Sequence, residues 1–437
     1  MSGVKVDGLR AWYALFVLLL AYILSFIDRN ILAMLVAPIR QSFAISDLQF
    51  SFLHGFAFAM FYIVLGLPIG RLADRANRKW IVTVGVFLWS IMTCLCGMAK
   101  TLPALFIARV GVGVGEAALS PPAYSLMGDY FSAKRLRFAT AIFALGITLG
   151  SGLSYKIGGA AYAWIEQQDL SALPIVGELL AWQATFVLVG LPGLLVVVLL
   201  LFVKEPARQQ SPQSSGSGEA SWGEVKSFLV EHWRVYLGLM GGVSMMAIIG
   251  YGTLAWFPEY LQRSYAMDRA EAGNALSQVF IWAGSGGTLA GAWFAGALQN
   301  RGYDDANMRL VMIAALVLVL PATIGPLTPT SSLALAFGSF VVFVHYPHFG
   351  VAMAAVTAAT PNNMRALVAA ILLFMSNLFG LALGGSIVAF ATDVIFANDA
   401  SLNYSLSLVA AVFYPLAAIL IWQGLAAYRA LISRSAN

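Results

Sequence analysis

The sequence Ser25-Phe26-Ile27-Asp28-Arg29-Asn30 places two charged residues inside an apolar run that extends from about Ala11 to Ala37. A run of this length can cross a bilayer as a helix. Ionisable groups at membrane depth cost about 3 kcal/mol each and usually face the bundle interior or a wet cavity. We therefore predict that Asp28 and Arg29 are functional; the alternative is a self-neutralising pair that only fixes helix packing.

The composition of the whole chain is that of an integral membrane protein. Hydrophobic residues make up 60% and charged residues 10% of 437 residues, and the mean hydropathy is +0.81. Soluble domains carry roughly 25% charged residues. Because the long apolar segments must satisfy their own backbone hydrogen bonds in lipid, we expect helices and not barrel strands.

The basic residues indicate topology. If the number of spans is even and the N-terminus is inside, eighteen Lys and Arg fall in inside segments, whereas only Arg40, Lys100, Arg263 and Arg269 fall outside. This asymmetry predicts cytoplasmic termini. The net charge of +5 therefore does not indicate a nucleic-acid partner, and we expect none.

Breaks of charge, Pro and Gly divide the sequence into apolar segments. There are twelve, near 11–37, 48–69, 80–99, 102–127, 136–163, 180–203, 236–262, 273–298, 308–329, 332–357, 366–391 and 403–428. The stretch between the sixth and the seventh has linker composition. We predict an all-α membrane protein of twelve transmembrane helices in two pseudo-symmetric halves, residues 1–203 and 236–437, joined by a cytoplasmic linker, 204–235.

An internal repeat supports this division. The loop after the second segment reads Gly70-Arg-Leu-Ala-Asp-Arg75, and the loop after the eighth reads Gly296-Ala-Leu-Gln-Asn-Arg301. Duplicated halves of transporters carry their site between the halves. In the first loop, Gly70, Asp74, Arg75 and Arg78 are predicted to form a latch that is made and broken as the halves rock; plain positive-inside anchoring explains the basic residues but not the Gly and Asp spacing.

The fourth segment carries Arg109-Val-Gly-Val-Gly-Val-Gly-Glu116. A spacing of seven residues puts Arg109 and Glu116 on one helix face, about 10 Å apart along the axis. The intervening glycines allow a neighbouring helix to approach closely.

Asp28, Arg29, Arg109 and Glu116 form a set of two acids and two bases. Burial favours the protonated carboxyl and a nearby guanidinium favours the carboxylate, so an anionic substrate that occupies an Arg can trigger protonation. Such a set can couple a proton to the binding of a substrate, and which acid carries the proton stays open.

The second half has no charged residue deep in its predicted spans, because Glu259 and Asp393 lie near predicted ends. It offers aromatic and polar side chains instead. Possible cavity-lining residues are His54 from the first half and, from the second, Tyr251, Trp256, Trp282, His345, Tyr346, His348, Phe374 and Asn377.

Taken together, Asp28-Arg29, the loop from Gly70 to Lys79 and the stretch from Arg109 to Ala117 resemble the spinster family of the major facilitator superfamily. The resemblance implies a twelve-helix transporter that works by alternating access on sphingosine-1-phosphate-like sphingolipids or lysophospholipids. It also implies that Asp28 and Glu116 are the proton-coupling acids and that Arg29 and Arg109 bind the head group or relay charge. Lys156 has no match in the family pattern, and Asn300 weakens the pseudo-symmetric latch.

Three other functions stay open: a proton-coupled multidrug antiporter, an organic-anion symporter, and, from another class, an uncoupled lipid scramblase or membrane sensor. We expect no enzyme, because nucleotide loops, metal-ligand spacings and nucleophile motifs do not occur. We also expect no metal or cofactor, with protons as the coupling ion. The expected partners are an amphipathic lipid-like substrate and membrane lipids, and the expected form is a monomer in the inner membrane.

Overall fold

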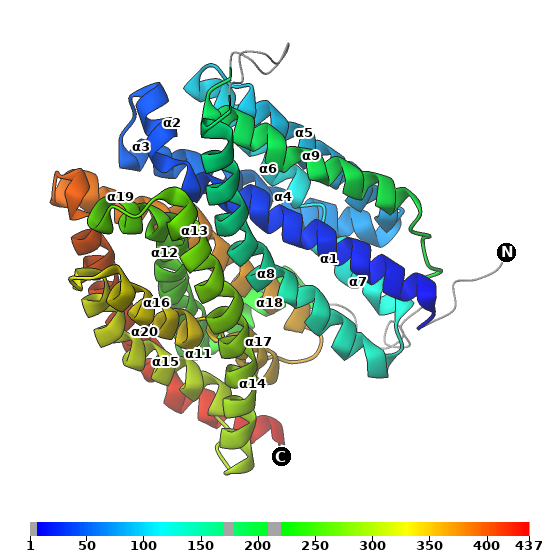
Figure 1. The fold of residues 1–437 in the computed structure, drawn as a ribbon. Helices are drawn as coiled ribbons and strands as arrows, with labels where there is room; N and C mark the ends of the chain where they lie inside the picture. The colour runs from blue at the N-terminus through cyan, green and yellow to red at the C-terminus, as the bar shows by residue number, and fades with distance from the viewer. Residues whose placement is uncertain (1–6, 169–178, 209–219, 437) are drawn as a thin grey trace. The chain divides into compact units, whose positions relative to one another are not determined.

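The computed structural model describes residues 7–168, 179–208 and 220–436, and all regular structure in these ranges is helical (Figure 1). Eleven helical segments of the described chain are long and apolar enough to cross a membrane. The segment predicted at 273–298 is helical too, but it is not among the eleven. Its glycines, such as Gly286 and Gly287, lower the hydropathy of an otherwise apolar stretch.

The chain divides into two compact units. Unit 1 comprises Met1–Gln209 and Leu254–Ile281, and unit 2 comprises Gln210–Thr253 and Trp282–Asn437. The division into two halves, 1–203 and 236–437, with a linker at 204–235 stays a prediction. In the observed packing, residues 254–281 group with the N-terminal part of the chain, although they lie beyond the predicted linker.

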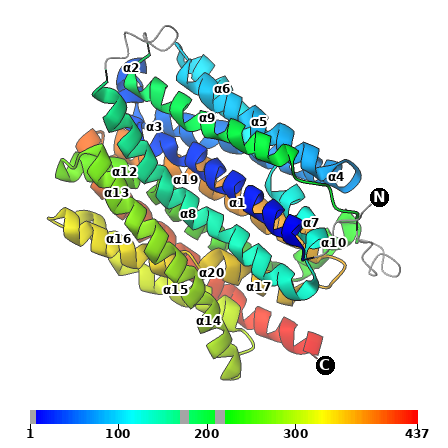
Figure 2. The same cartoon turned by 45° about the vertical axis from the view of Figure 1, so that its right-hand side comes forward.

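The helices of unit 1 are α1 (Leu9–Asn30), η1 (Ile31–Met34), α2 (Val36–Phe43), α3 (Asp47–Ser51), η2 (Phe52–Phe56), α4 (Ala57–Arg75), α5 (Arg78–Gly97), α6 (Leu102–Glu116), α7 (Ser120–Tyr130), α8 (Ala133–Glu166), α9 (Ala181–Leu201) and α13 (Arg269–Gln278). The end of α12 (Gly242–Tyr265) also belongs to this unit. Figures 1 and 2 show α1 beside α8, and α5 beside α9.

Glycines set the distance between α1 and α8. A Cβ atom added to Gly150 of α8 would lie 2.8 Å from the backbone oxygen of Ile23 in α1. Close approach of this kind is how helices associate in lipid, where apolar burial alone gives no driving force between them. The glycine-rich fifth segment therefore supports the C-terminal half of α1, which carries Asp28 and Arg29.

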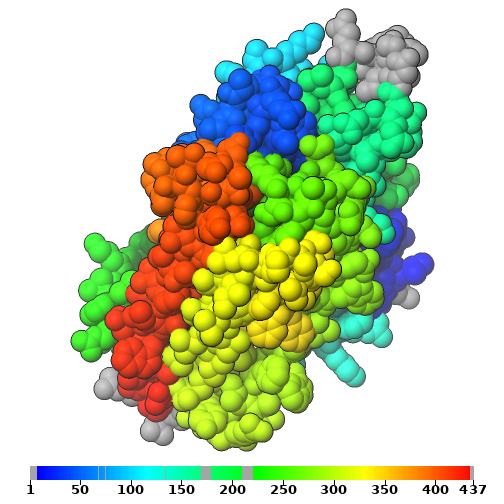
Figure 3. All heavy atoms as spheres, turned by 60° about the vertical axis from the view of Figure 1, so that its left-hand side comes forward, coloured from blue at the N-terminus to red at the C-terminus, as the bar shows by residue number. Residues whose placement is uncertain are grey.

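The helices of unit 2 are α10 (Trp222–Glu231), α11 (Trp233–Tyr236), η5 (Leu237–Gly241), the start of α12, α14 (Ser285–Asn300), α15 (Ala306–Ile324), η7 (Gly325–Leu327), α16 (Ser331–His345), α17 (His348–Ala359), α18 (Arg365–Ser376), η8 (Asn377–Leu383), α19 (Gly384–Phe390), η9 (Ala391–Ile395), η10 (Asp399–Ser401) and α20 (Leu402–Ala436). A π-helical segment, η6 (Val279–Gly284), leads from unit 1 into α14. Figure 3 shows the red C-terminal helix α20 next to the yellow-green α15, with which it packs.

Candidate functional site

The end of α1 creates the first part of the candidate site. The α-helix stops at Asn30 and a tighter 3₁₀ turn follows, so the last carbonyl groups of α1 are available to other donors. Arg109 of α6 uses two of them. Its Nη1 donates to the carbonyl oxygen of Asp28 at 3.1 Å, and its Nη2 donates to that of Arg29 at 3.4 Å. A fully buried guanidinium thus fixes α6 against the end of α1.

An ion pair between Arg29 and Glu116 forms the second part. Arg29 Nη2 lies 2.6 Å from Glu116 Oε2, and the two side chains are 7% and 1% exposed. The guanidinium carbon of Arg29 also lies 4.7 Å from the ring centre of Phe58 and 5.0 Å from that of Tyr62. Aromatic faces attract a cation that has lost its water, which lowers the cost of burying Arg29.

Two carboxylate oxygens at this site have no hydrogen-bond partner in the described part of the chain: Asp28 Oδ1 and Glu116 Oε1. Both residues are almost fully buried, at 1% and 2% exposure. A buried carboxylate oxygen without a donor is costly, and protonation of the carboxyl is one way to lower that cost. The structure therefore brings together all four charged residues that the sequence singles out.

The glycines of α6 explain how the four residues meet. A Cβ atom on Gly113 would collide with the backbone oxygen of Phe58 in α4, and one on Gly115 would lie 2.7 Å from the backbone nitrogen of Trp89 in α5. The α6 backbone is thus pressed against two neighbours. This arrangement places Phe58 where its ring covers Arg29.

The predicted latch loop holds a second charged cluster. Arg78, at the start of α5, is 2% exposed and forms ion pairs with Asp129 of α7 and with Glu205, which lies 2.8 Å from its Nε. Glu205 also accepts the backbone N–H of Lys79 at 2.9 Å. Arg78 therefore ties the loop to α7 and to the segment after α9.

The other predicted latch residues take different positions. Gly70 has only the Cβ of Pro121 near the position of an added Cβ, at 3.9 Å, and Arg75 is exposed. The side chain of Asp74 lies outside the described ones. The carbonyls that end α4, those of Ala73 and Ala76, each accept a hydrogen bond from Arg208 at 2.8 Å.

His54 and Trp256 both lie near Phe50 in unit 1. The rings of Phe50 and His54 are nearly parallel with centres 6.2 Å apart, and Trp256 meets Phe50 edge-on at 6.0 Å. Both residues are buried, and His54 Nε2 has no hydrogen-bond partner among the described residues. The structure thus groups these two predicted residues around the ring of Phe50.

His345 and His348 form a polar group in unit 2. His345 Nδ1 lies 3.0 Å from the hydroxyl of Tyr414, and His348 Nδ1 lies 2.6 Å from the carbonyl oxygen of His345. Gly250 makes room for the His345 ring, because an added Cβ would lie 2.5 Å from His345 Nε2. His345 is therefore a packed, hydrogen-bonded residue between α12, α16 and α20.

The remaining candidates are dispersed over unit 2. Trp282 is 73% exposed and Phe374 is 42% exposed. Tyr251, Tyr346 and Asn377 are half-buried. Lys156, on α8 of unit 1, is exposed.

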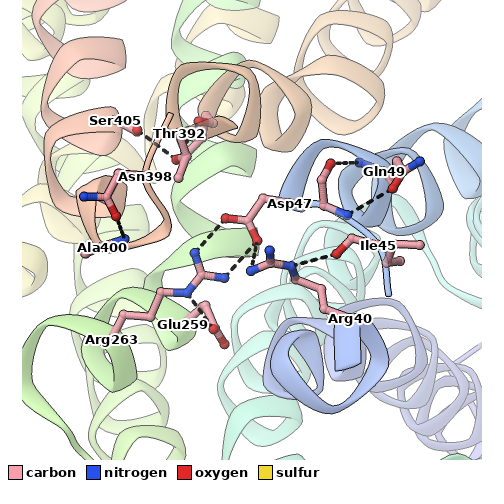
Figure 4. A network of polar contacts seen from close by, with 12 residues as sticks. Arg40, Ile45, Asp47, Gln49, Glu259, Arg263, Thr392, Asn398, Ala400 and Ser405 are labelled. Carbon is pink, nitrogen blue, oxygen red and sulfur yellow. Dashed lines mark hydrogen bonds and ion pairs between the residues drawn. The ribbon is translucent and has the colours of Figure 1, made fainter. Parts of the chain in front are cut away.

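Sequence reasoning missed several charged residues that form ion pairs. Asp129 and Glu205, the partners of Arg78, drew no assignment because each sits at the edge of an apolar segment. The same applies to Asp47, which is fully buried. Glu259, which lies near the end of a predicted span, is 4% exposed and is paired with Arg263 (Figure 4). The sequence did hold one signal for these ion pairs: Asp47 and Glu259 each lie near an Arg that is predicted to face outside.

The family follows from comparison with known proteins. The sequence pattern of the Major Facilitator Superfamily matches residues 18–385. A solved bacterial homologue of the human lysosomal transporter spinster, inward-facing and unoccupied, aligns with a TM-score of 0.79 and 25% identity over 98% of both chains. This chain belongs to the major facilitator superfamily. Its predicted resemblance to spinster proteins and its predicted all-α fold are confirmed, and it is a multi-pass membrane protein.

Two relatives carry names that describe different transport functions. The chain is 27% identical to an MFS-type efflux pump of Mycolicibacterium smegmatis over 426 residues, 96% of this chain and 94% of that protein. It is also 27% identical to the sphingosine-1-phosphate transporter SPNS2 of Danio rerio over 259 residues, 57% of this chain and 47% of that protein. The chain thus spans about half the length of this spinster relative.

Proposed function

We propose that this protein is a proton-coupled secondary transporter that moves an amphipathic anionic lipid by alternating access. The substrate class is a sphingosine-1-phosphate-like lipid or a lysophospholipid, as the name of the SPNS2 relative suggests. The observation that carries the proposal is the buried ion pair between Arg29 and Glu116. Arg29 can bind a phosphate group through two parallel hydrogen bonds, because the guanidinium geometry matches phosphate in a bidentate way.

The coupling step is a competition for Arg29. A phosphate head group that binds the guanidinium displaces the Glu116 carboxylate, which is then a buried charge without its partner. Uptake of a proton by Glu116 removes that charge and stabilises the substrate-bound form. Release of the proton restores the pair and expels the anion.

Asp28 and Arg109 support this step. Arg109 holds the backbone of Asp28 and Arg29, so a movement of α6 is transmitted directly to the head-group residue. Asp28, whose Oδ1 has no partner among the described residues, is the second proton-exchanging acid.

The proposal also assigns the remaining predicted residues, the oligomeric state and the location of the protein. Gly70, Asp74, Arg75 and Arg78 act as the conformational latch, and the aromatic and histidine side chains named above line the path of the lipid tail. The protein works as a monomer in the inner membrane with both termini in the cytoplasm, and it carries out no enzymatic step.

A second candidate function is export of drug-like compounds. The M. smegmatis relative named an efflux pump aligns over nearly the full length of this chain. A buried acid pair would then serve the same proton exchange, but the substrate would be a cation or a neutral compound and Arg29 would not bind it.

Transport in proteoliposomes separates these functions. Labelled lysophospholipid or sphingoid phosphate is followed with and without an imposed pH gradient in wild type, Glu116→Gln and Asp28→Asn. We expect gradient-dependent lipid transport that the substitutions uncouple or abolish. The control is Glu231→Gln, at an exposed acid on α10, which should transport like wild type.

Two results would overturn the proposal. Transport of cationic drugs without lipid transport would favour the efflux function. Lipid movement that ignores both the gradient and the substitutions would indicate an uncoupled scramblase.

A further inference from the structure

Helix α5 borders Asp28 with polar side chains that have no role in the site as described so far. The Thr93 hydroxyl of α5 lies beside the Asp28 carboxyl. The thiols of Cys94 and Cys96 also interact electrostatically with Asp28. One turn of α5, residues 93–96, therefore adjoins the first acid of the candidate site.

Thr93 and Asp28 are both buried groups that lack a well-aligned partner. Thr93 is fully buried and Asp28 is 1% exposed. Within the described ranges, neither Thr93 Oγ1 nor Asp28 Oδ1 forms a hydrogen bond of normal geometry. An unsatisfied polar atom is costly in such a position. Since the two groups lie beside each other, each can supply the hydrogen-bond partner that the other needs.

The hydroxyl of Thr93 does not bind the acceptor that its own helix offers. A Thr in a helix can donate to the carbonyl oxygen four residues earlier. Thr83 of the same helix donates in this way to Lys79 at 2.8 Å, and Thr185 of α9 makes the equivalent bond at 2.8 Å. Among the described residues Thr93 has no such bond. Its hydroxyl is therefore available to Asp28, across the interface between helices.

Close backbone packing determines the position of Thr93. A Cβ atom on Gly85 of α5 would lie 2.8 Å from the backbone oxygen of Gly115 in α6. One on Gly111 of α6 would lie 2.6 Å from the side chain of Met92, the residue before Thr93. These contacts hold α5 tightly against α6, and α6 in turn holds the end of α1. Thr93 is thus placed by rigid elements and not by a mobile loop.

A hydroxyl suits Asp28 better than the other polar groups of the site do. Arg29 pairs with Glu116 at 2.6 Å, and Arg109 donates to two backbone carbonyls of α1. A guanidinium can only donate a hydrogen bond, whereas a hydroxyl donates to a carboxylate and accepts from a protonated carboxyl. Thr93 can therefore bind Asp28 in either protonation state.

We propose that Thr93 is a positioning residue for Asp28, which it holds in one orientation both as the carboxylate and as the carboxylic acid. The inference rests on the proposed function, because it deepens the role of Asp28 as a proton-exchanging acid. The proton itself is gained and lost by Asp28, and Thr93 exchanges none. The hydroxyl only turns about its C–O bond, so no heavy atom has to move when the charge of Asp28 changes.

Infrared spectroscopy of the full chain in lipid nanodiscs, without substrate, tests the contact directly. With isotope-labelled aspartate, the band that Asp28→Asn removes belongs to Asp28, whether that group is ionised or protonated. Thr93→Val keeps the shape of the side chain and removes the hydroxyl, and Thr93→Ser keeps the hydroxyl. We expect the Asp28 band to shift in Thr93→Val and to keep its wild-type position in Thr93→Ser. Should Thr93→Val fold poorly, Thr93→Ala makes the same test.

The chain offers a matched control on the same helix. Thr83→Val also removes a buried hydroxyl, but one that is bound to the Lys79 carbonyl, so the Asp28 band should not move. In the proteoliposome assay, Thr93→Val should lower gradient-driven lipid transport about tenfold, the scale of a hydrogen bond to a charged group. Thr93→Ser should restore most of this transport, and Thr83→Val should transport like wild type.

The two readouts separate this inference from the proposed function. An Asp28 band at the same position in Thr93→Val and wild type overturns the positioning role, whatever the protein transports. Equal shifts in Thr93→Val and Thr93→Ser, or an equal shift in Thr83→Val, would indicate altered packing and would overturn it too. A band that shifts only in Thr93→Val, in a protein whose transport ignores the pH gradient, confirms that Thr93 holds Asp28 and refutes the proton coupling.

Discussion

Nη2 of Arg29 lies 2.6 Å from Oε2 of Glu116, and this contact joins the C-terminal part of α1 to the last residue of α6. Both side chains are almost completely buried. The pair therefore affects both folding and transport, and the two effects need separate tests.

Removal of one partner should destabilise the protein more than removal of both. Glu116→Ala leaves a buried guanidinium with its main anionic partner gone, which costs about 3–5 kcal/mol. The double variant Arg29→Met/Glu116→Leu has no charge to compensate and should fold nearly as well as wild type, yet without transport. Thermal unfolding in detergent, read by size-exclusion fluorescence, measures the first effect and the proteoliposome assay the second. A double variant that transports would remove Arg29 from the mechanism.

Gly113 should tolerate no side chain. In Gly113→Ala the new methyl group meets the backbone oxygen of Phe58, so α4 and α6 must move apart and the Phe58 ring must leave Arg29. We expect a lower melting temperature and at least a tenfold loss of transport, on the scale of about 1–3 kcal/mol for overpacking. Gly66→Ala on α4 is the control, because nothing lies within 4 Å of its added Cβ. Equal effects of the two substitutions would contradict the packing argument.

Arg78 should matter more than Arg75, its neighbour in the same loop. Arg78→Gln leaves the Asp129 and Glu205 carboxylates without their shared guanidinium, whereas Arg75 is exposed. We expect a clear drop in melting temperature for Arg78→Gln and little change for Arg75→Gln, since exposed charges contribute about 0–1 kcal/mol. A transport defect in Arg75→Gln at normal stability would instead support a direct latch role for the exposed Arg.

Asp7 should give a pH-dependent contribution to stability. Hydrogen bonds from Ser132, including its backbone N–H at 3.0 Å, lower the pKa of Asp7. A carboxyl with a lowered pKa stabilises the folded state above its unfolded pKa of about 3.9, and the contribution disappears as the pH falls through the folded value. Asp7→Asn should therefore lower the melting temperature at pH 7, and the difference from wild type should shrink below about pH 4. A difference that is constant with pH would show that the contact does not depend on ionisation.

The residues of the candidate site could be predicted because charge inside an apolar span is rare and costly. Which of these residues contact one another could not be predicted. The seven-residue spacing put Arg109 and Glu116 on one face, but Arg109 donates to backbone carbonyls of α1 and Glu116 pairs with Arg29. The cause is the end of α1 at Asn30, which exposes those carbonyls and which hydropathy does not reveal.

The ion pairs that Arg263 forms with Asp47 and Glu259 illustrate a second limit. Asp47 and Glu259 lie near the ends of apolar segments, where sequence patterns suggest solvent, and their burial depends on a contact between segments more than two hundred residues apart. Only packing in three dimensions decides whether such an acid is solvated or paired.

The aromatic residues around Arg29 restrict how a ligand can reach it. The guanidinium carbon lies 4.7–5.0 Å from the ring centres of Phe26, Phe58 and Tyr62. A guanidinium donates all its hydrogen bonds in its own plane, so a new acceptor has to reach the edge of the Arg29 guanidinium, past the rings that surround it. A flat or tetrahedral anion with two adjacent oxygens meets this requirement, whereas a halide or a single hydroxyl gains only one bond, so the surrounding rings make Arg29 a filter for the shape of the anion as well as for its charge.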